Sequence, residues 1–141
     1  MGINMKLMQA LLACLLGSGL AQTSPRAEDI QTTVVVKQLQ QNKLQDVTLV
    51  KKGQVLVYLI SVSTRAEFPA GRLGLKLQAP QGATLLPGRT QVKGYSFRLE
   101  YSQDGKTFQK TLKSWKYLRV VVLNPVKAGV NLEVRVFSKV N

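Results

Sequence analysis

The sequence has 141 residues, which is enough for one domain with a single hydrophobic core. Lysine and arginine outnumber aspartate and glutamate by 20 to 7, giving a formal net charge of +13, and the chain has no histidine and one cysteine. These counts exclude a histidine general base and a zinc site built from cysteine and histidine. The few carboxylates are scattered, so we expect no metal site, no cofactor and no enzyme.

The N-terminal segment has the parts of a secretory signal peptide. Lys6 supplies a positive charge, residues 7–16 form an apolar run, and Gly19 and Ala21 place small side chains where signal peptidase reads. We therefore predict that residues 1–21 are a signal peptide and that cleavage follows Ala21. The mature chain would then have 19 basic against 7 acidic residues, a net charge of +12, and no cysteine.

Two other interpretations of this segment stay open. As a membrane anchor, the apolar run is short for the ~30 Å hydrocarbon core of a bilayer and is interrupted by glycines. Alternatively, Leu11-Leu12-Ala13-Cys14 resembles a lipoprotein signal, which would attach a lipid at Cys14. With a cleaved signal peptide, the protein is exported to the periplasm, the cell surface or the medium, and the mature chain has no transmembrane helix.

The first part of the mature chain predicts a leader and two strands. Residues 22–29 are polar and include Pro25, which is typical of a flexible leader. Residues 30–36 are rich in β-branched side chains, which favour a strand. Both a short helix and an extended loop fit the glutamine-rich residues 37–45. Residues 47–51 predict a second short strand.

Residues 54–63 predict the centre of a sheet. They are apolar at nearly every position, which is typical of a strand covered on both faces. One face would consist of Leu56, Tyr58, Ile60 and Val62. Residues 68–71 predict a loop, and the alternation in residues 73–77 predicts another strand. Neighbouring prolines and glycines limit residues 84–86 to a short edge strand.

The clearest hairpin spans residues 95–122. Its first inward row would be Phe97, Leu99 and Tyr101. Asp104-Gly105 is a strong turn signal, because glycine adopts positive φ without steric cost. Phe108 would open the return strand. The second inward row would be Leu118, Val120 and Val122.

A final strand covers residues 130–136, after turn signals at Asn124-Pro125 and Ala128-Gly129. The chain thus predicts seven or eight short strands at spacings of roughly 8–12 residues, with no long amphipathic helix after the signal peptide. This pattern predicts an all-β fold, an antiparallel β-sandwich formed by residues 30–141.

From residue 51 onward, the chain carries a series of turn and strand motifs: Gly53, the apolar row in residues 56–62, Pro80 to Thr84, Pro87-Gly88, Tyr101 to Phe108, Leu118-Arg119-Val120 and Ala128-Gly129. Together these motifs resemble one copy of a bacterial repeat, the "domain of unknown function eleven" family. They cover about two-thirds of the chain. The resemblance implies an immunoglobulin-like sandwich in a secreted or cell-surface protein. The motifs consist of turn and core residues, so they imply a fold rather than an activity.

Positive charge is concentrated in residues 106–119, where aromatic side chains lie among the basic ones. Such a pattern is typical of surfaces that bind nucleic acid or another acidic polymer, provided that the chain turns near Lys113-Ser114 and gathers the charges. The candidate polyanion-binding residues are Lys110, Lys113, Trp115, Lys116 and Arg119. The alternative is a charged surface that maintains solubility and opposes edge-to-edge pairing, with Trp115 partly in the core.

The first functional hypothesis is a non-catalytic, exported protein of a bacterial cell envelope that acts as a binding or scaffolding module. Its partner would be an envelope protein or an acidic polymer. The alternative is an electrostatic binder of DNA or an acidic wall polymer through residues 106–119. A hydrolase is the third hypothesis, for which the sequence offers no acid–base pair.

Overall fold

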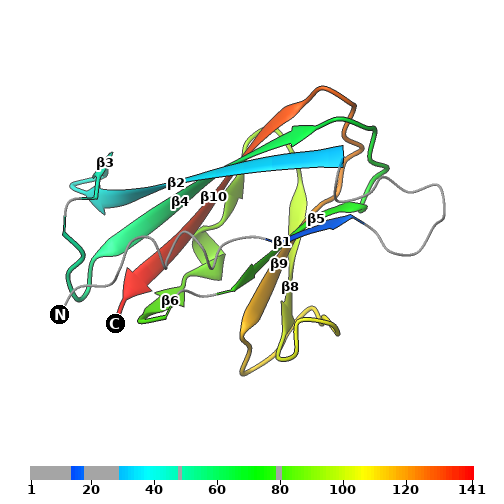
Figure 1. The fold of residues 1–141 in the computed structure, drawn as a ribbon. Coiled ribbons are helices and arrows are strands. Elements are labelled where there is room, and N and C mark those ends of the chain that lie inside the picture. The colour runs from blue at the N-terminus through cyan, green and yellow to red at the C-terminus, as the bar shows by residue number, and fades with distance from the viewer. Residues whose placement is uncertain (1–13, 18–28, 48, 79–80) are drawn as a thin grey trace.

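Two antiparallel β-sheets make up the fold (Figure 1). The structure is a computed structural model that describes residues 14–17, 29–47, 49–78 and 81–141. The smaller sheet has the order β1 (Cys14–Gly17), β5 (Leu73–Gln78), β9 (Tyr117–Val122) and β8 (Phe97–Ser102). The larger sheet has the order β3 (Lys43–Asp46), β2 (Ile30–Gln40), β4 (Val55–Thr64), β10 (Asn131–Val140) and β6 (Ala83–Leu85), and β7 (Gln91–Val92) also pairs with β10. The all-β, antiparallel fold predicted from the sequence is confirmed.

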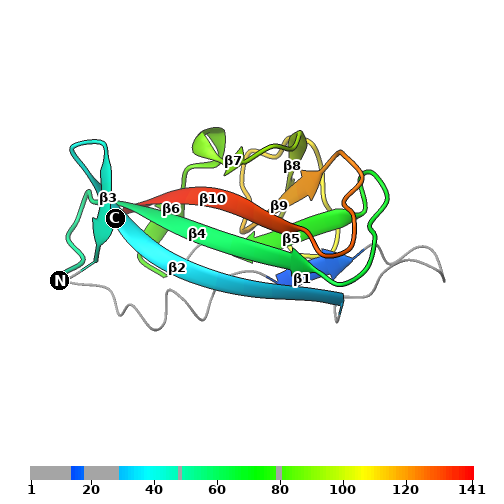
Figure 2. The same ribbon diagram turned by 90° about the horizontal axis from the view of Figure 1, so that it is seen from above.

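β4 lies between β2 and β10 in the larger sheet (Figure 2). Its core face consists of Leu56, Tyr58, Ile60 and Val62, each at most 1% exposed. β9 contributes the facing row of the smaller sheet, Leu118, Val120 and Val122, to the same buried cluster. The two sheets therefore close around one core, and both rows predicted from alternation are confirmed.

The opposite face of β4 is covered only in part, although the sequence predicted a strand covered on both faces, because Val55 and Leu59 are half-buried and Ser61 is exposed. Val57 is fully buried and lies across from Phe137 of β10. The guanidinium of Arg89 is 4.9 Å from the centre of the Phe137 ring. Arg89 belongs to a short 3₁₀ helix, η2 (Pro87–Arg89), which follows β6.

Residues 37–51 differ from the prediction. β2 continues to Gln40, the chain reverses at Gln41 and Asn42, and β3 returns along β2. Both turn residues have positive φ, 52° and 62°, as a two-residue type I′ hairpin requires. The segment is therefore neither a helix nor a loop, and glutamine at the first turn position hid the signal. A strand was also expected at residues 47–51, but the described residues of this range, 47 and 49–51, form none. Val50 is instead buried in the core.

Phe68 lies in a connection that was predicted as a loop, yet its side chain is fully buried. Backbone hydrogen bonds between Phe68 and Val126, with N–O distances of 2.7 and 2.8 Å, fix this position. Periodicity could not reveal it, because Phe68 is an isolated apolar residue rather than a member of an alternating row.

β1 lies inside the predicted signal peptide and pairs with β5, so that Cys14 is opposite Lys76 and Gly17 is opposite Leu73. The predicted cleavage site after Ala21 and residues 22–28 of the leader fall outside the described residues, so cleavage stays a prediction. Across the ranges that the structure describes, no helix has the length and apolar character needed to cross a bilayer.

Candidate functional site

Most of the basic segment lies in a loop. β8 ends at Ser102 and β9 begins at Tyr117, and residues 103–116 extend beyond the ends of both strands (Figure 1). This corrects the prediction that Phe108 opens the return strand. An isolated β-bridge joins Tyr101 of β8 to Gln109 of the loop through two backbone hydrogen bonds, each with an N–O distance of 2.8 Å. The predicted change of direction at Lys113-Ser114 is confirmed, since both residues lie in a bend.

The loop begins with a turn that Asp104 holds together. Its Oδ1 accepts hydrogen bonds from the backbone N–H groups of Lys106 and Thr107 at 2.8 and 2.9 Å. The hydroxyl of Ser102 donates to the same oxygen at 2.8 Å and accepts from the N–H of Gly105 at 2.9 Å. The backbone bonds from Thr107 and Lys106, followed by the Ser102 bond, stabilise the carboxylate and lower the pKa of Asp104 to about 2.

Gly105 brings this turn against the smaller sheet. Its φ of +77° confirms the positive φ expected at this position, and a Cβ here would lie 3.3 Å from the ring of Tyr117. On β5, Lys76 Nζ lies 3.5 Å from the Gly105 carbonyl oxygen and 5.8 Å from the centre of the Tyr117 ring. The start of the loop is thus packed on residues of β5 and β9.

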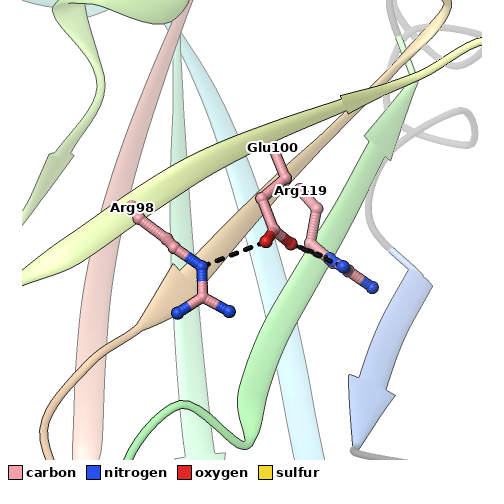
Figure 3. A network of polar contacts seen from close by, with 3 residues as sticks. All are labelled: Arg98, Glu100 and Arg119. Carbon is pink, nitrogen blue, oxygen red and sulfur yellow. Dashed lines mark hydrogen bonds and ion pairs between the residues drawn. The ribbon is translucent and has the colours of Figure 1, made fainter. Parts of the chain in front are cut away.

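Glu100 organises the neighbouring charges (Figure 3). Its two carboxylate oxygens accept from Arg119 Nε at 2.7 Å and from Arg98 Nε at 3.0 Å. Burial is the largest single influence and raises the pKa of Glu100, but the hydrogen bonds and charges of Arg119 and Arg98 together outweigh it, so the pKa is lowered. The Arg119 guanidinium also lies 4.1 Å from the centre of the Phe108 ring. Arg119 therefore links the loop to β8.

The structure divides the predicted binding residues into two groups. Lys110, Lys113 and Lys116 are exposed in the loop, together with Lys106. Trp115 is half-buried against the core, and its ring centre lies 5.2 Å from that of Tyr101 at an interplanar angle of 52°. Trp115 is therefore not the exposed stacking aromatic that the binding hypothesis expected. The loop therefore presents four exposed lysine side chains, whereas contacts of Trp115 and Arg119 hold the loop against the smaller sheet.

A polar depression on the larger sheet was missed by the sequence reasoning. Its volume is ≈ 680 Å³, and its lining includes Thr33, Ser61, Ser63, Asn131 and Glu133. These side chains come from β2, β4 and β10, with Thr33 opposite Ser61 and Ser61 opposite Glu133. The only signal in the sequence is the recurrence of small polar residues in three separate strands, which becomes informative once the register is known.

Within the described ranges, no group of three or more histidine, cysteine, aspartate or glutamate residues could hold a metal ion. Comparison with protein-family models, curated proteins and solved structures gives no match to this chain.

Proposed function

We propose that the protein is a non-catalytic, exported module of a bacterial cell envelope that binds or scaffolds other envelope components. The observation that carries this proposal is the basic loop, residues 103–116, which is exposed and yet attached to the smaller sheet. Contacts of Asp104, Gly105 and Arg119 fix its backbone, while its lysines face solvent. A charged surface on a fixed backbone loses little conformational entropy on binding.

The acidic side chains support a structural rather than a catalytic role. Asp104 and Glu100 have lowered pKa values because backbone N–H groups or arginines stabilise their charged forms. Asp46 has a lowered pKa because of its hydrogen bond and ion pair with Lys37. Carboxylates held in the charged form are poor general acids near neutral pH.

The immunoglobulin-like character belongs to this proposal as well. The spatial order β2-β4-β10-β6 facing β5-β9-β8 resembles the four-plus-three layout of an immunoglobulin constant domain. The chain order departs from that layout, because β8 and β9 precede β10 instead of following it. We propose an immunoglobulin-like sandwich in arrangement, with a different strand connection.

A second candidate function is the binding of an acidic polymer, DNA or an acidic wall polysaccharide. The specific observation in its favour is that Lys106, Lys110, Lys113 and Lys116 are all exposed in the basic loop. If each neutralises one phosphate, the logarithm of the affinity for DNA should fall with the logarithm of salt concentration with a slope of about −3.6. Binding would then weaken roughly a hundredfold between ~50 and ~200 mM salt.

The test replaces these four lysines by glutamate and measures retention on DNA and acidic-polysaccharide columns at ~50 mM salt. A matched variant with Lys51, Lys52, Lys93 and Lys127 replaced by glutamate makes the same change in net charge at other exposed positions. We expect the loop variant to lose retention and the matched variant to keep most of it. If the wild type is not retained, the acidic-polymer function is wrong. Docking to an envelope protein, which depends less on salt, would then be the remaining proposal.

A further inference from the structure

The outer edge of β5 is covered by the chain's own N-terminal segment. β1 pairs antiparallel with β5 and is the only described strand on that side of β5 (Figure 1). β1 belongs to residues 1–21, which the proposed export would remove. Under that proposal, the mature protein lacks the strand that covers β5, and this edge of the smaller sheet opens. An open edge is a template for adding a strand from another chain.

The hydrogen-bonding phase of β5 identifies the backbone groups at this edge. The Val122 carbonyl accepts from the Gly71 N–H at 3.0 Å, so Val122 directs its backbone groups toward β5. Leu73 lies opposite Val122 and therefore directs its own backbone groups toward β9. Because these groups alternate in direction along a strand, the N–H and C=O groups of Gly74 and Lys76 face the outer edge.

β1 is in register with these groups. Leu16 lies opposite Gly74, and Cys14 lies opposite Lys76. By the phase of β5, both are hydrogen-bonded pairs, in which each residue exchanges two backbone bonds with its partner. Removal of β1 would therefore leave the N–H and C=O groups of both β5 residues without a strand to pair with.

The core also reaches this edge. Leu73, Leu75 and Leu77 belong to the core cluster, and each is 2% exposed in the presence of β1. The pairing places Leu15 opposite Leu75. Without β1, this row would form the margin of the core. An incoming strand with an apolar residue opposite Leu75 would remove apolar surface from water.

The single charge of β5 does not protect its edge. Charged side chains on an edge oppose the addition of a strand, and the other edge strand of this sheet, β8, carries Arg98 and Glu100. The Lys76 ammonium lies 3.5 Å from the Gly105 carbonyl oxygen and 5.8 Å from the centre of the Tyr117 ring of β9. The Lys76 side chain is therefore directed toward β9 and away from the outer edge.

We propose that the β5 edge of the mature protein binds an extended, apolar segment of a partner protein in the cell envelope, in the place that β1 holds before cleavage. This inference rests on the proposed export. The segment would run antiparallel to β5, with an apolar residue opposite Leu75 and backbone N–H groups opposite Gly74 and Lys76. Main-chain hydrogen bonds would supply affinity, and the apolar position would supply specificity. β1 shows the form of the occupant, because it is a short strand that pairs with no other described strand.

Amide hydrogen exchange tests the edge by comparing the full-length chain with a shortened chain that begins at Gln22. We expect the Gly74 and Lys76 amides to exchange at least about tenfold faster in the shortened chain, while the Leu75 amide, which faces β9, stays slow. Leu16→Pro in the full-length chain removes an N–H that faces β5 and should have the same effect, even if the shortened chain does not fold. Unchanged exchange at both amides contradicts the pairing.

A peptide with the sequence of residues 12–19 and the change Cys14→Ser is the probe for binding. We expect it to bind the shortened chain and to restore protection of the two edge amides. N-methylation of residue 16 in the peptide removes an N–H that faces β5 and should weaken binding at least about tenfold. N-methylation of residue 15, whose N–H faces away from β5, is the matched control and should have little effect. Absence of binding, or equal effects of the two modifications, overturns the proposal.

Two further measurements separate this proposal from its alternatives. Intact mass of the secreted protein shows whether residues 1–21 are removed, and their retention would overturn the cleavage and leave the edge closed by β1. Absence of peptide binding to a chain that is cleaved overturns the strand site alone and leaves the export standing. Sedimentation of the shortened chain tests for a second copy at the edge, and a dimer that the peptide dissociates would overturn the assignment to a different partner.

Discussion

Gly105→Ala tests how firmly the basic loop is attached to the sheet. Gly105 has φ +77°, a conformation that costs a residue with a side chain about 1 kcal/mol or more. The new Cβ would also lie 3.3 Å from the Tyr117 ring, closer than an ordinary contact. Gly94→Ala is a matched control, because Gly94 has φ +80° and a Cβ there would meet nothing within 4 Å. We expect free-energy losses of about 1 kcal/mol at Gly94 and about 2 kcal/mol at Gly105.

Urea unfolding followed by circular dichroism measures both losses, and each kcal/mol corresponds to a fall in Tm of about 4 °C for a domain of this size. Gly105→Val should cost more than alanine, because a β-branched residue is strained further at positive φ. Tyr117→Leu should reduce the difference between the two alanine variants by removing the ring. Equal losses at Gly94 and Gly105 would refute the packing of the turn against Tyr117.

Three further outcomes are expected. The pKa of Asp104 is about 2, below its usual 3.8. The Asp104 carboxylate therefore stabilises the fold above about pH 4, and this contribution is lost as the pH falls toward 2. Asp104→Asn should flatten the dependence of the urea midpoint on pH in this window. Tyr58→Phe removes the 2.8 Å hydrogen bond to buried Ser138 and should cost about 1–2 kcal/mol of unfolding free energy, part of which Ser138→Ala should restore. Secreted protein should begin at Gln22 by intact mass, and a lipid at Cys14 or retention of residues 1–21 would contradict the cleavage prediction.

Side chains in regular rows were the predictable part of the fold. Leu56 to Val62 in β4 and Leu118 to Val122 in β9 repeat every second residue, and burial on one face of a strand produces that period. Phe68 and Val50 are buried by contacts outside any row, so the sequence carries no local sign of them. The turn at Gln41-Asn42 was missed because glutamine seldom adopts positive φ.

The sequence predicted which residues the candidate site contains, but not which of them are exposed and which are packed against the sheet. The sequence places Trp115 and Arg119 among lysines. It cannot show that the Trp115 ring contacts Tyr101 or that Arg119 bonds to Glu100. That depends on Tyr101 and Glu100 of β8, which the strand pairing brings beside them. The polar depression on the larger sheet needs the register of three strands, which no local pattern determines.

The position of β10 beside β4 has a consequence for the order in which the chain can fold. The residues of β4 are synthesised well before those of β10 (residues 131–140), yet β10 pairs with β4 along almost the whole length of β4. A growing chain that lacks β10 leaves one side of β4 without a partner and the core open, and such long-range pairings form slowly. The core therefore closes only when nearly the whole sequence is available. Under the export that we propose, this delay would leave the chain unfolded until synthesis is nearly complete, and an unfolded chain can be threaded across a membrane.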